Sequence, residues 1–213
     1  MPKQTRDILI AIVAIAAAVF SVYYAVSGRS EKVNLDTYSV LGTVAAEESA
    51  KLTGNKGEVL ILVPDSGPNK NPSVEAEVKA FQELLKKQKL TMAMEKVEVT
   101  PMLMMATGGG VPPEQFFKAL EKHKGVAAVV LLFGFPELSD ADVETLKKYN
   151  VKTIVVSSFR SGYKRFMDSG ALQLVISPRQ DTPPTSTQQP RTVRERFDQD
   201  FVLISAGEAR RSP

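Results

Sequence analysis

The residues best suited to bind a small polar ligand follow three apolar runs of the chain. A carboxylate and a hydroxyl come after residues 59–63, a glycine and an aromatic ring after residues 126–133, and two hydroxyls and a guanidinium after residues 151–156. Because the carboxyl ends of parallel strands meet at one edge of a sheet, these groups are expected to share a polar cleft. The candidate ligand-binding residues are Asp65, Ser66, Gly134, Phe135, Ser157, Ser158 and Arg160. A solvated loop edge without a ligand is the alternative.

Three consecutive glycines at residues 108–110 form a second candidate site. Glycines allow a backbone to approach a phosphate closely, but a phosphate-binding loop also needs a Lys-Ser/Thr pair or a following acidic partner at a defined spacing. The chain has neither at this position. We therefore expect a flexible connection between a strand and a helix.

The remaining reactive side chains favour structural roles. His123, the only histidine, lies in the last turn of an expected helix beside two lysines, where it is expected to be a solvated capping residue rather than a catalyst. The acidic group Asp140, Asp142 and Glu144 lacks the spacing of a calcium loop and is expected to complement a helix dipole. The chain contains no Cys. We expect no catalytic residue, no metal site and no cofactor, and infer that the protein is not an enzyme.

Short apolar runs alternate with amphipathic helical patterns from residue 58 onward. This alternation predicts an α/β fold with a three-layer, mostly parallel sheet of the Rossmann or flavodoxin-like kind. Helices are expected to start at Asn71 or Ser73, at the Pro112-Pro113 pair, after Ser139 and near Tyr163. The expected strands are residues 59–63, 94–99, 126–133, 151–156, 172–177 and 201–204.

An uncharged apolar run, residues 8–26, stands almost at the amino terminus. As a helix it would span roughly 28 Å, close to the ~30 Å hydrocarbon core of a bilayer. We expect a single transmembrane anchor, so that the bilayer itself is a partner. The alternative is a signal peptide, cleaved near residues 25–27, that would leave a soluble protein.

The orientation of this anchor depends on the few basic residues around it. Lys3 and Arg6 precede the apolar run, and Arg29 and Lys32 follow it. Because the amino-terminal tail is short and basic, we place it in the cytoplasm and the main domain outside, in a periplasm. The reverse orientation, with a cytoplasmic domain, is the alternative.

The rest of the chain suffices for one soluble domain. A helix expected at residues 37–52 has an apolar side that would pack on the main domain or on a neighbouring membrane protein. The expected segments are a basic tail (1–7), the anchor (8–26), a stalk or linker helix (27–56), the α/β domain (57–206) with a polar Pro/Thr/Gln-rich loop (178–192), and a flexible tail (207–213).

The charge of the chain excludes one class of partner. The formal net charge is +3, charged residues make up 24% of the chain, and no block of Lys and Arg is long enough to follow a phosphate backbone. We therefore expect no nucleic acid. The expected partners are therefore another protein, a second copy of the chain or a small-molecule ligand.

The order of elements resembles one lobe of the type I periplasmic binding proteins. The resemblance covers residues 58–177 and is carried by residues 59–66, 126–136 and 151–158. It implies binding of sugars and similar solutes, although a flavodoxin-like domain would show the same alternation. A type I binding protein closes two lobes over its solute, and this chain has the length for one. High-affinity capture by a monomer is therefore not expected.

Two functions follow from these observations. The first hypothesis is a membrane-anchored, non-catalytic interaction subunit that docks its domain on a membrane complex or a soluble partner. The methionines at 102, 104 and 105 would suit such an interface, although core packing is the favoured interpretation of them. The alternative is an extracytoplasmic module that binds or senses a small, sugar-like solute.

Overall fold

The computed structural model describes residues 15, 17, 20–21, 34–65, 67, 70–98, 100–156, 162–180 and 190–206. Contacts divide the chain into two compact units, Met1–Asn34 and Leu35–Pro213. The expected membrane span at residues 8–26 lies outside the described residues, apart from the helical positions 15, 17, 20 and 21. Among the described residues, no helix has the length and hydropathy needed to cross a bilayer.

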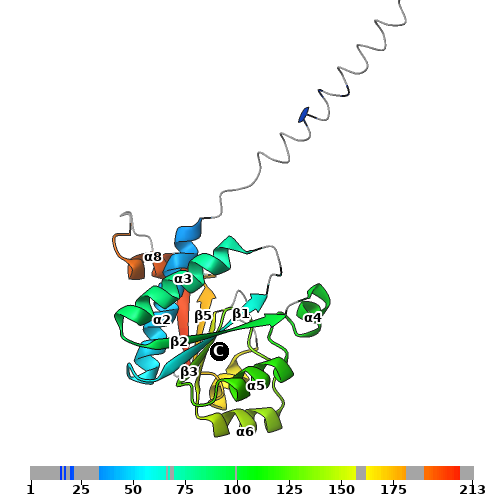
Figure 1. The fold of residues 1–213 in the computed structure, drawn as a ribbon, viewed down its shortest axis with the longest axis vertical. Coiled ribbons are helices and arrows are strands. Elements are labelled where there is room, and N and C mark those ends of the chain that lie inside the picture. Colours follow the sequence, from blue (N-terminus) through cyan, green and yellow to red (C-terminus); the bar gives the residue numbers. More distant parts are fainter. Residues whose placement is uncertain are drawn as a thin grey trace, which may run out of the picture. The chain divides into compact units, whose positions relative to one another are not determined.

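A single sheet of six strands organises the second unit (Figure 1). Its order is β2-β1-β3-β4-β5-β6, in which β1 to β5 run parallel and β6 runs antiparallel to β5. The strands are β1 (Glu58–Asp65), β2 (Thr91–Glu98), β3 (Ala128–Leu131), β4 (Lys152–Val156), β5 (Leu174–Pro178) and β6 (Phe201–Ser205). The predicted mostly parallel α/β fold is confirmed.

Helices cover both faces of the sheet, as the two hydrophobic cores show. One face carries α2 (Leu35–Thr53), α3 (Pro72–Lys87) and α8 (Val193–Asp200), and the other carries α5 (Pro113–Lys122), α6 (Asp140–Tyr149) and α7 (Lys164–Asp168). A short helix, α4 (Pro101–Ala106), follows β2. The expected three layers are therefore present in the described domain.

The first strand shows why an uninterrupted apolar run predicts a strand buried on both sides. Val59, Ile61 and Val63 face the core under α2 and α3, while Leu60 and Leu62 face the core under α5 and α6. Because successive side chains of a strand point to opposite faces, a strand between two helical layers needs apolar residues at every position.

Side-chain caps set two of the helix starts where the sequence predicts them. Asn71 Oδ1 accepts the backbone N–H of Ser73 at 3.0 Å and starts α3. Ser139 and Asp142 form a capping box at the start of α6. The hydrogen bonds from the Ser139 hydroxyl and backbone lower the pKa of Asp142. The acidic group there is a helix cap, as expected.

Helix α2 packs closely on α3, the first of the two expected alternatives. Val44, Ala45 and Ala46 are fully buried in the shared core. At Gly42, an added Cβ atom would lie well inside contact distance of the Glu77 carbonyl oxygen. The two helix backbones therefore approach closely, which only glycine allows at this position.

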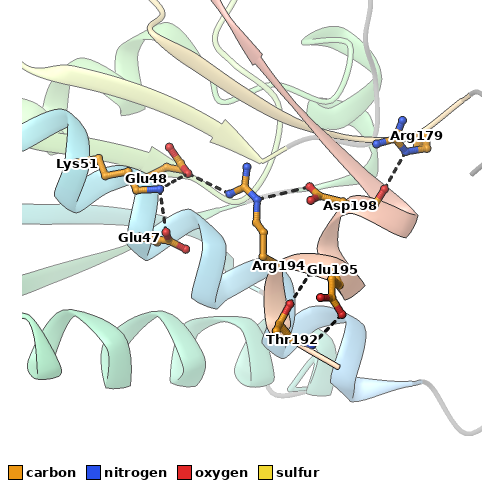
Figure 2. A network of polar contacts seen from close by, with 8 residues as sticks. All are labelled: Glu47, Glu48, Lys51, Arg179, Thr192, Arg194, Glu195 and Asp198. Carbon is orange, nitrogen blue, oxygen red and sulfur yellow. Dashed lines mark hydrogen bonds and ion pairs between the residues drawn. The ribbon is translucent and has the colours of Figure 1, made fainter. Parts of the chain in front are cut away.

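The sequence analysis missed α8, which an ion-pair network attaches to α2 (Figure 2). Arg194 places Nη1 3.1 Å from Glu48 Oε1 of α2 and Nε 3.5 Å from Asp198 Oδ1 of its own helix. Glu48 also lies 3.0 Å from Lys51 Nζ. Thr192 and Glu195 form a capping box that starts the helix. Charged side chains leave α8 without a clear apolar periodicity, so the sequence did not predict it. The same kind of side chain, Arg194, forms the ion pair that joins α8 to α2.

Strand β6 returns to the sheet beside β5 in the antiparallel direction. The polar stretch at residues 178–192 therefore joins two elements of one sheet and is no boundary between domains. Of this stretch, residues 181–189 lie outside the described residues.

Candidate functional site

The strand order places the candidate site at the carboxyl end of β1. Chain connections run from β1 to β2 on one side and then cross to β3 on the other side. In open parallel sheets such a reversal leaves a crevice outside the carboxyl ends of the strands, where ligands bind. The residues that follow β1 and β3 are the first to consider.

Asp65 ends β1 and is the one predicted site residue with an exposed charge in the described part of the chain. Its Oδ1 accepts the backbone N–H of Gly67 at 3.2 Å and lies 4.0 Å from Lys96 Nζ of the neighbouring strand. The turn fixes the carboxylate at the rim, and no other described residue bonds Oδ2. Oδ2 is therefore available to accept hydrogen bonds from a ligand.

A depression of about 360 Å³ opens beside Asp65, between β1, β2 and the first turns of α3. Apolar side chains line it together with two carboxylates, three ammonium groups and two amides. The apolar lining is Val63, Pro64, Val74, Val78 and Met94, and the remaining lining is Asp65, Gly67, Lys70, Asn71, Glu75, Lys79, Gln82 and Lys96. A lining that mixes donors, acceptors and apolar side chains suits a small polyhydroxylated solute.

A larger depression of about 560 Å³ lies between the outer faces of α2 and α3. Helix residues alone line it, among them Ser39, Thr43, Ala76 and Ala80. It contains no strand end and none of the predicted site residues. We therefore take the smaller depression beside Asp65 as the candidate site.

The triple glycine pairs with Gly134 by backbone contacts. Gly134 donates its N–H to Gly109 O at 3.0 Å and accepts the N–H of Val111 at 3.1 Å, and Gly110 and Gly134 form an isolated parallel bridge. A Cβ atom on Gly134 would lie 2.8 Å from Gly109 O. The glycines allow two backbone segments to come into contact at the carboxyl edge of the sheet. The connection that we expected to be flexible is therefore hydrogen-bonded to the segment at Gly134.

Phe135 turns its ring into the core. The ring lies 4.8 Å from that of Phe166 and 6.2 Å from that of Phe116, measured between centroids, and the residue is buried. Phe135 is not among the residues that line the depression beside Asp65. The other predicted site residues, Ser66, Ser157, Ser158 and Arg160, lie outside the described residues.

Sequence reasoning did not single out Lys96, Lys79 and Gln82, which line the depression. Lys96 reaches Asp65 only because β2 pairs with β1 in a register that aligns Asp65 with Glu98. The positions of Lys79 and Gln82 on the exposed side of α3 can be deduced from helical spacing once the buried face of the helix is known. The position of Lys96 beside Asp65 depends on the strand register, and no sequence motif predicts that register.

The expectation for His123 is half correct. The residue occupies the C-cap position of α5, as expected, but it is not a solvated side chain. Its Nε2 lies 3.2 Å from Glu95 Oε2 of β2, and Lys122 Nζ lies 2.8 Å from the same oxygen. The hydrogen bond from Lys122, followed by that from His123, lowers the pKa of Glu95. This cluster attaches the end of α5 to the edge strand.

Met102 and Met105 are exposed, so the favoured expectation of core packing is wrong for these two methionines. They lie on α4, at whose start Thr100 Oγ1 accepts the backbone N–H of Leu103, and they are 84% and 86% exposed. Thr100 and Pro101 are the signal that predicts this helix start.

Glu77 of α3 is a buried acid away from the candidate site. Only 5% of the residue is exposed, and Oε1 has no hydrogen-bond partner in the described part of the chain. Burial raises the pKa of Glu77 to about 8. The group is therefore neutral at pH 7 and below. Within the described residues, no group of three or more His, Asp or Glu side chains could hold a metal ion.

No family model and no curated protein matches the chain. Solved structures do match its fold. A sugar-binding protein of a sugar ABC transporter from Bacillus halodurans has a TM-score of 0.51 and 13% identity, with coverage of 81% of this chain and 63% of that one. The arabinose-binding protein AraP from Geobacillus stearothermophilus has a TM-score of 0.50 and 15% identity, with coverage of 82% and 62%.

A XylFII–LytSN complex is similar to the same degree, with a TM-score of 0.51, 17% identity and coverage of 80% of this chain and 60% of that one. The chain thus spans about three fifths of the length of these structures. At such low identities the likeness concerns the fold alone. The described domain has the α/β fold of one lobe of a type I periplasmic binding protein.

Proposed function

We propose that this protein is a non-catalytic module that binds or senses a small, sugar-like solute at the carboxyl end of β1. The single observation that carries the proposal is the depression of about 360 Å³ beside Asp65, whose lining combines apolar side chains with charged and amide groups. The sugar-binding proteins with the same fold support the choice of solute.

The chemistry of the depression suits neighbouring hydroxyl groups. Oδ2 of Asp65, which no described residue bonds, accepts hydrogen bonds, while the ammonium groups of Lys96 and Lys79 donate them. Bonds to ionised groups are about twice as strong as neutral ones, so two or three of them fix the orientation of a sugar ring. The apolar side chains of Val74 and Val78 then contact the C–H face of the ring.

One lobe encloses only part of a solute, so the affinity of a single copy is low. Ligand sites of high affinity bury most of the ligand surface. We place dissociation constants in the millimolar range, which corresponds to about 4 kcal/mol of binding free energy. A sensing role, or completion of the cleft by a second chain, is compatible with this affinity.

The test is a titration of the full chain with L-arabinose, D-glucose and D-ribose, followed by calorimetry and by the thermal unfolding midpoint. We expect saturable binding of at least one sugar. Asp65→Asn keeps the oxygen that accepts the Gly67 N–H but removes the charge, so affinity should fall about 10- to 100-fold. Glu83→Gln is the matched control, because it removes one carboxylate from α3 outside the depression.

Two results would contradict the proposal. One is the absence of saturable binding by the unmodified chain to every sugar tested. The other is equal binding by the Asp65→Asn and Glu83→Gln variants, which would place the ligand elsewhere on the surface.

The location of the module is part of the proposal. The apolar run at residues 8–26 would anchor it in a membrane, and the basic tail before it favours a domain on the extracytoplasmic side. Protease treatment of intact cells checks this: an extracytoplasmic domain is digested after removal of the outer barrier, whereas a cytoplasmic domain is protected.

A docking role is the second candidate, favoured by one observation. Met102 and Met105 are almost fully exposed on α4, and flexible thioethers suit adaptable protein interfaces. Extraction in mild detergent, followed by sizing, separates the two functions. A discrete assembly that the double substitution of both methionines by Ser disrupts would favour docking over solute binding.

A further inference from the structure

The charged side chains that line the depression beside Asp65 do not balance. The lining contains three ammonium groups, those of Lys70, Lys79 and Lys96, and two carboxylates, those of Asp65 and Glu75. The rest of the loop between β1 and α3 adds no charge, since residues 66–69 and 71 are all uncharged. The lining therefore carries one uncompensated positive charge.

Ion pairs account for two of the three lysines. Lys96 Nζ lies 4.0 Å from Asp65 Oδ1, and Lys70 Nζ lies 3.5 Å from Glu75 Oε1. In the part of the chain that the structure describes, the third ammonium group, that of Lys79, has no ion pair or hydrogen bond with another side chain. The uncompensated charge is therefore on Lys79.

Two glutamates of α3 lie one helical turn from Lys79 and leave it available to a ligand. Glu75 precedes it by four residues and is paired with Lys70, and Glu83 follows it by four residues and lines the other depression. Ion pairs at this spacing on an exposed helix face are weak. A ligand that presents a carboxylate together with hydroxyl groups can therefore compete for this lysine.

The amino-terminal turn of α3 adds positive potential to the same depression. Asn71 and Val74 line the depression, and the helix of 16 residues has the positive end of its dipole at this turn. Glu75 in the first turn offsets part of this potential. The helix end therefore acts in the same direction as Lys79 and favours an anionic group over a neutral one.

We propose that this depression prefers an acidic sugar, one that carries a carboxylate, over its neutral counterpart, and that Lys79 binds the carboxylate. The inference rests on the solute-binding function proposed above and names the class of solute. One carboxylate supplies one negative charge, which equals the uncompensated charge of the lining. Asp65 and Lys96 are then left to bind the hydroxyl groups of the ring.

The test is a calorimetric titration of the full chain with two pairs of sugars, D-glucuronate with D-glucose and D-galacturonate with D-galactose. Within each pair the sugars differ in one group, a carboxylate in place of a hydroxymethyl group. We expect at least one uronate to bind about three- to tenfold more tightly than its neutral counterpart, as suits one exposed charge pair. This preference should diminish in 1 M NaCl, where the screening length falls to about 3 Å.

A pair of variants assigns the preference to Lys79. Lys79→Gln keeps an N–H donor but lacks the charge, so the ratio of the two affinities should fall below about twofold. Lys86→Gln is the matched control, because it removes the same charge from the same helix and lines neither depression. The ratio should be unchanged in this control.

The outcomes separate this inference from the function on which it rests. Saturable binding of acidic and neutral sugars with equal affinity would overturn the preference and leave solute binding intact. The same holds for a preference that survives Lys79→Gln or that both variants lower equally. The absence of saturable binding of every sugar, acidic or neutral, would contradict the proposed function and this inference with it.

Discussion

The two faces of the sheet are packed by different means. Under α2, α3 and α8, small residues such as Ala45, Ala46 and Gly42 let the helix backbones approach each other closely. Under α5, α6 and α7, a cluster of aromatic rings that includes Phe116, Phe135 and Phe166 fills the space between helices and sheet. Close approach of two helix backbones therefore distinguishes the first core, although it also buries Phe81 and Phe197, and a cluster of neighbouring rings distinguishes the second.

The two cores also differ in the surroundings of their carboxyl groups. The core under α2 and α3 contains Glu77, a buried carboxyl with an unpartnered oxygen in the described part of the chain. On the other side, Glu95 lies at the edge of the sheet, forms an ion pair with Lys122 and lies within hydrogen-bond distance of His123. We therefore expect the stability of the core under α2 and α3 to depend on pH. The stability of the core under α5, α6 and α7 should depend on the volume of its aromatic rings.

The largest expected effect comes from Glu77. Its folded-state pKa of about 8 lies above the ordinary value of 4.5, so the folded state holds a proton that the unfolded state releases as pH rises between these values. The free energy of unfolding should therefore fall from about pH 4.5 to about pH 8. At about 1.4 kcal/mol per pKa unit, the total loss is about 4 to 5 kcal/mol.

Denaturant unfolding from pH 4 to pH 9 measures this loss. Glu77→Gln should remove it and be more stable than the unmodified chain at pH 9. Groups with lowered pKa values, such as Asp142 and Glu95, contribute in the opposite sense, since their stabilisation is lost as pH falls below the ordinary carboxyl range. The difference between the two chains isolates Glu77, and parallel pH profiles would refute its role.

Glu77 also shows what sequence reasoning could and could not supply. The apolar stripe Val74, Val78, Phe81 and Leu85 predicted α3 correctly, but Glu77 lies beside this stripe and looks like a solvent-facing residue. It is buried only because α2 packs there, and a contact between two helices has no local signature. The same holds for Gly42, which in a sequence reads as a weak point in a helix.

Strands were predictable because local composition determines them. Runs such as residues 59–63 and 126–133 are apolar at every position, which predicts burial on both faces. Helix α8 was missed because Phe197 is its one buried residue, although the Thr192–Glu195 capping box was readable. The candidate site was half predictable: Asp65 follows a strand, while Lys96 joins it through strand register alone.

The next effect in size tests the aromatic core. Phe166→Ala removes a buried ring that lies 4.8 Å from Phe135, and it leaves a cavity that the surrounding rings fill poorly. We expect the free energy of unfolding to fall by about 3 to 4 kcal/mol, with an unchanged dependence on pH. Phe166→Leu is the control and should cost less than about 1.5 kcal/mol. Equal losses for both variants would indicate that ring volume is not what this core requires.

The smallest of the three effects tests the close helix contact. Gly42→Ala adds one methyl group against the Glu77 carbonyl, so α2 and α3 must separate or shift. Overpacking costs about 1 to 3 kcal/mol, and the better helix propensity of Ala returns about 1 kcal/mol. We expect a net loss of up to about 2 kcal/mol by denaturant unfolding. Ser39→Ala, one turn earlier on α2 and half-buried, should change stability by less than about 0.5 kcal/mol. Because separation of the helices would admit water to Glu77, Gly42→Ala should also weaken the pH dependence of stability. A stabilised variant with the original pH profile would show that the two backbones are not in close contact.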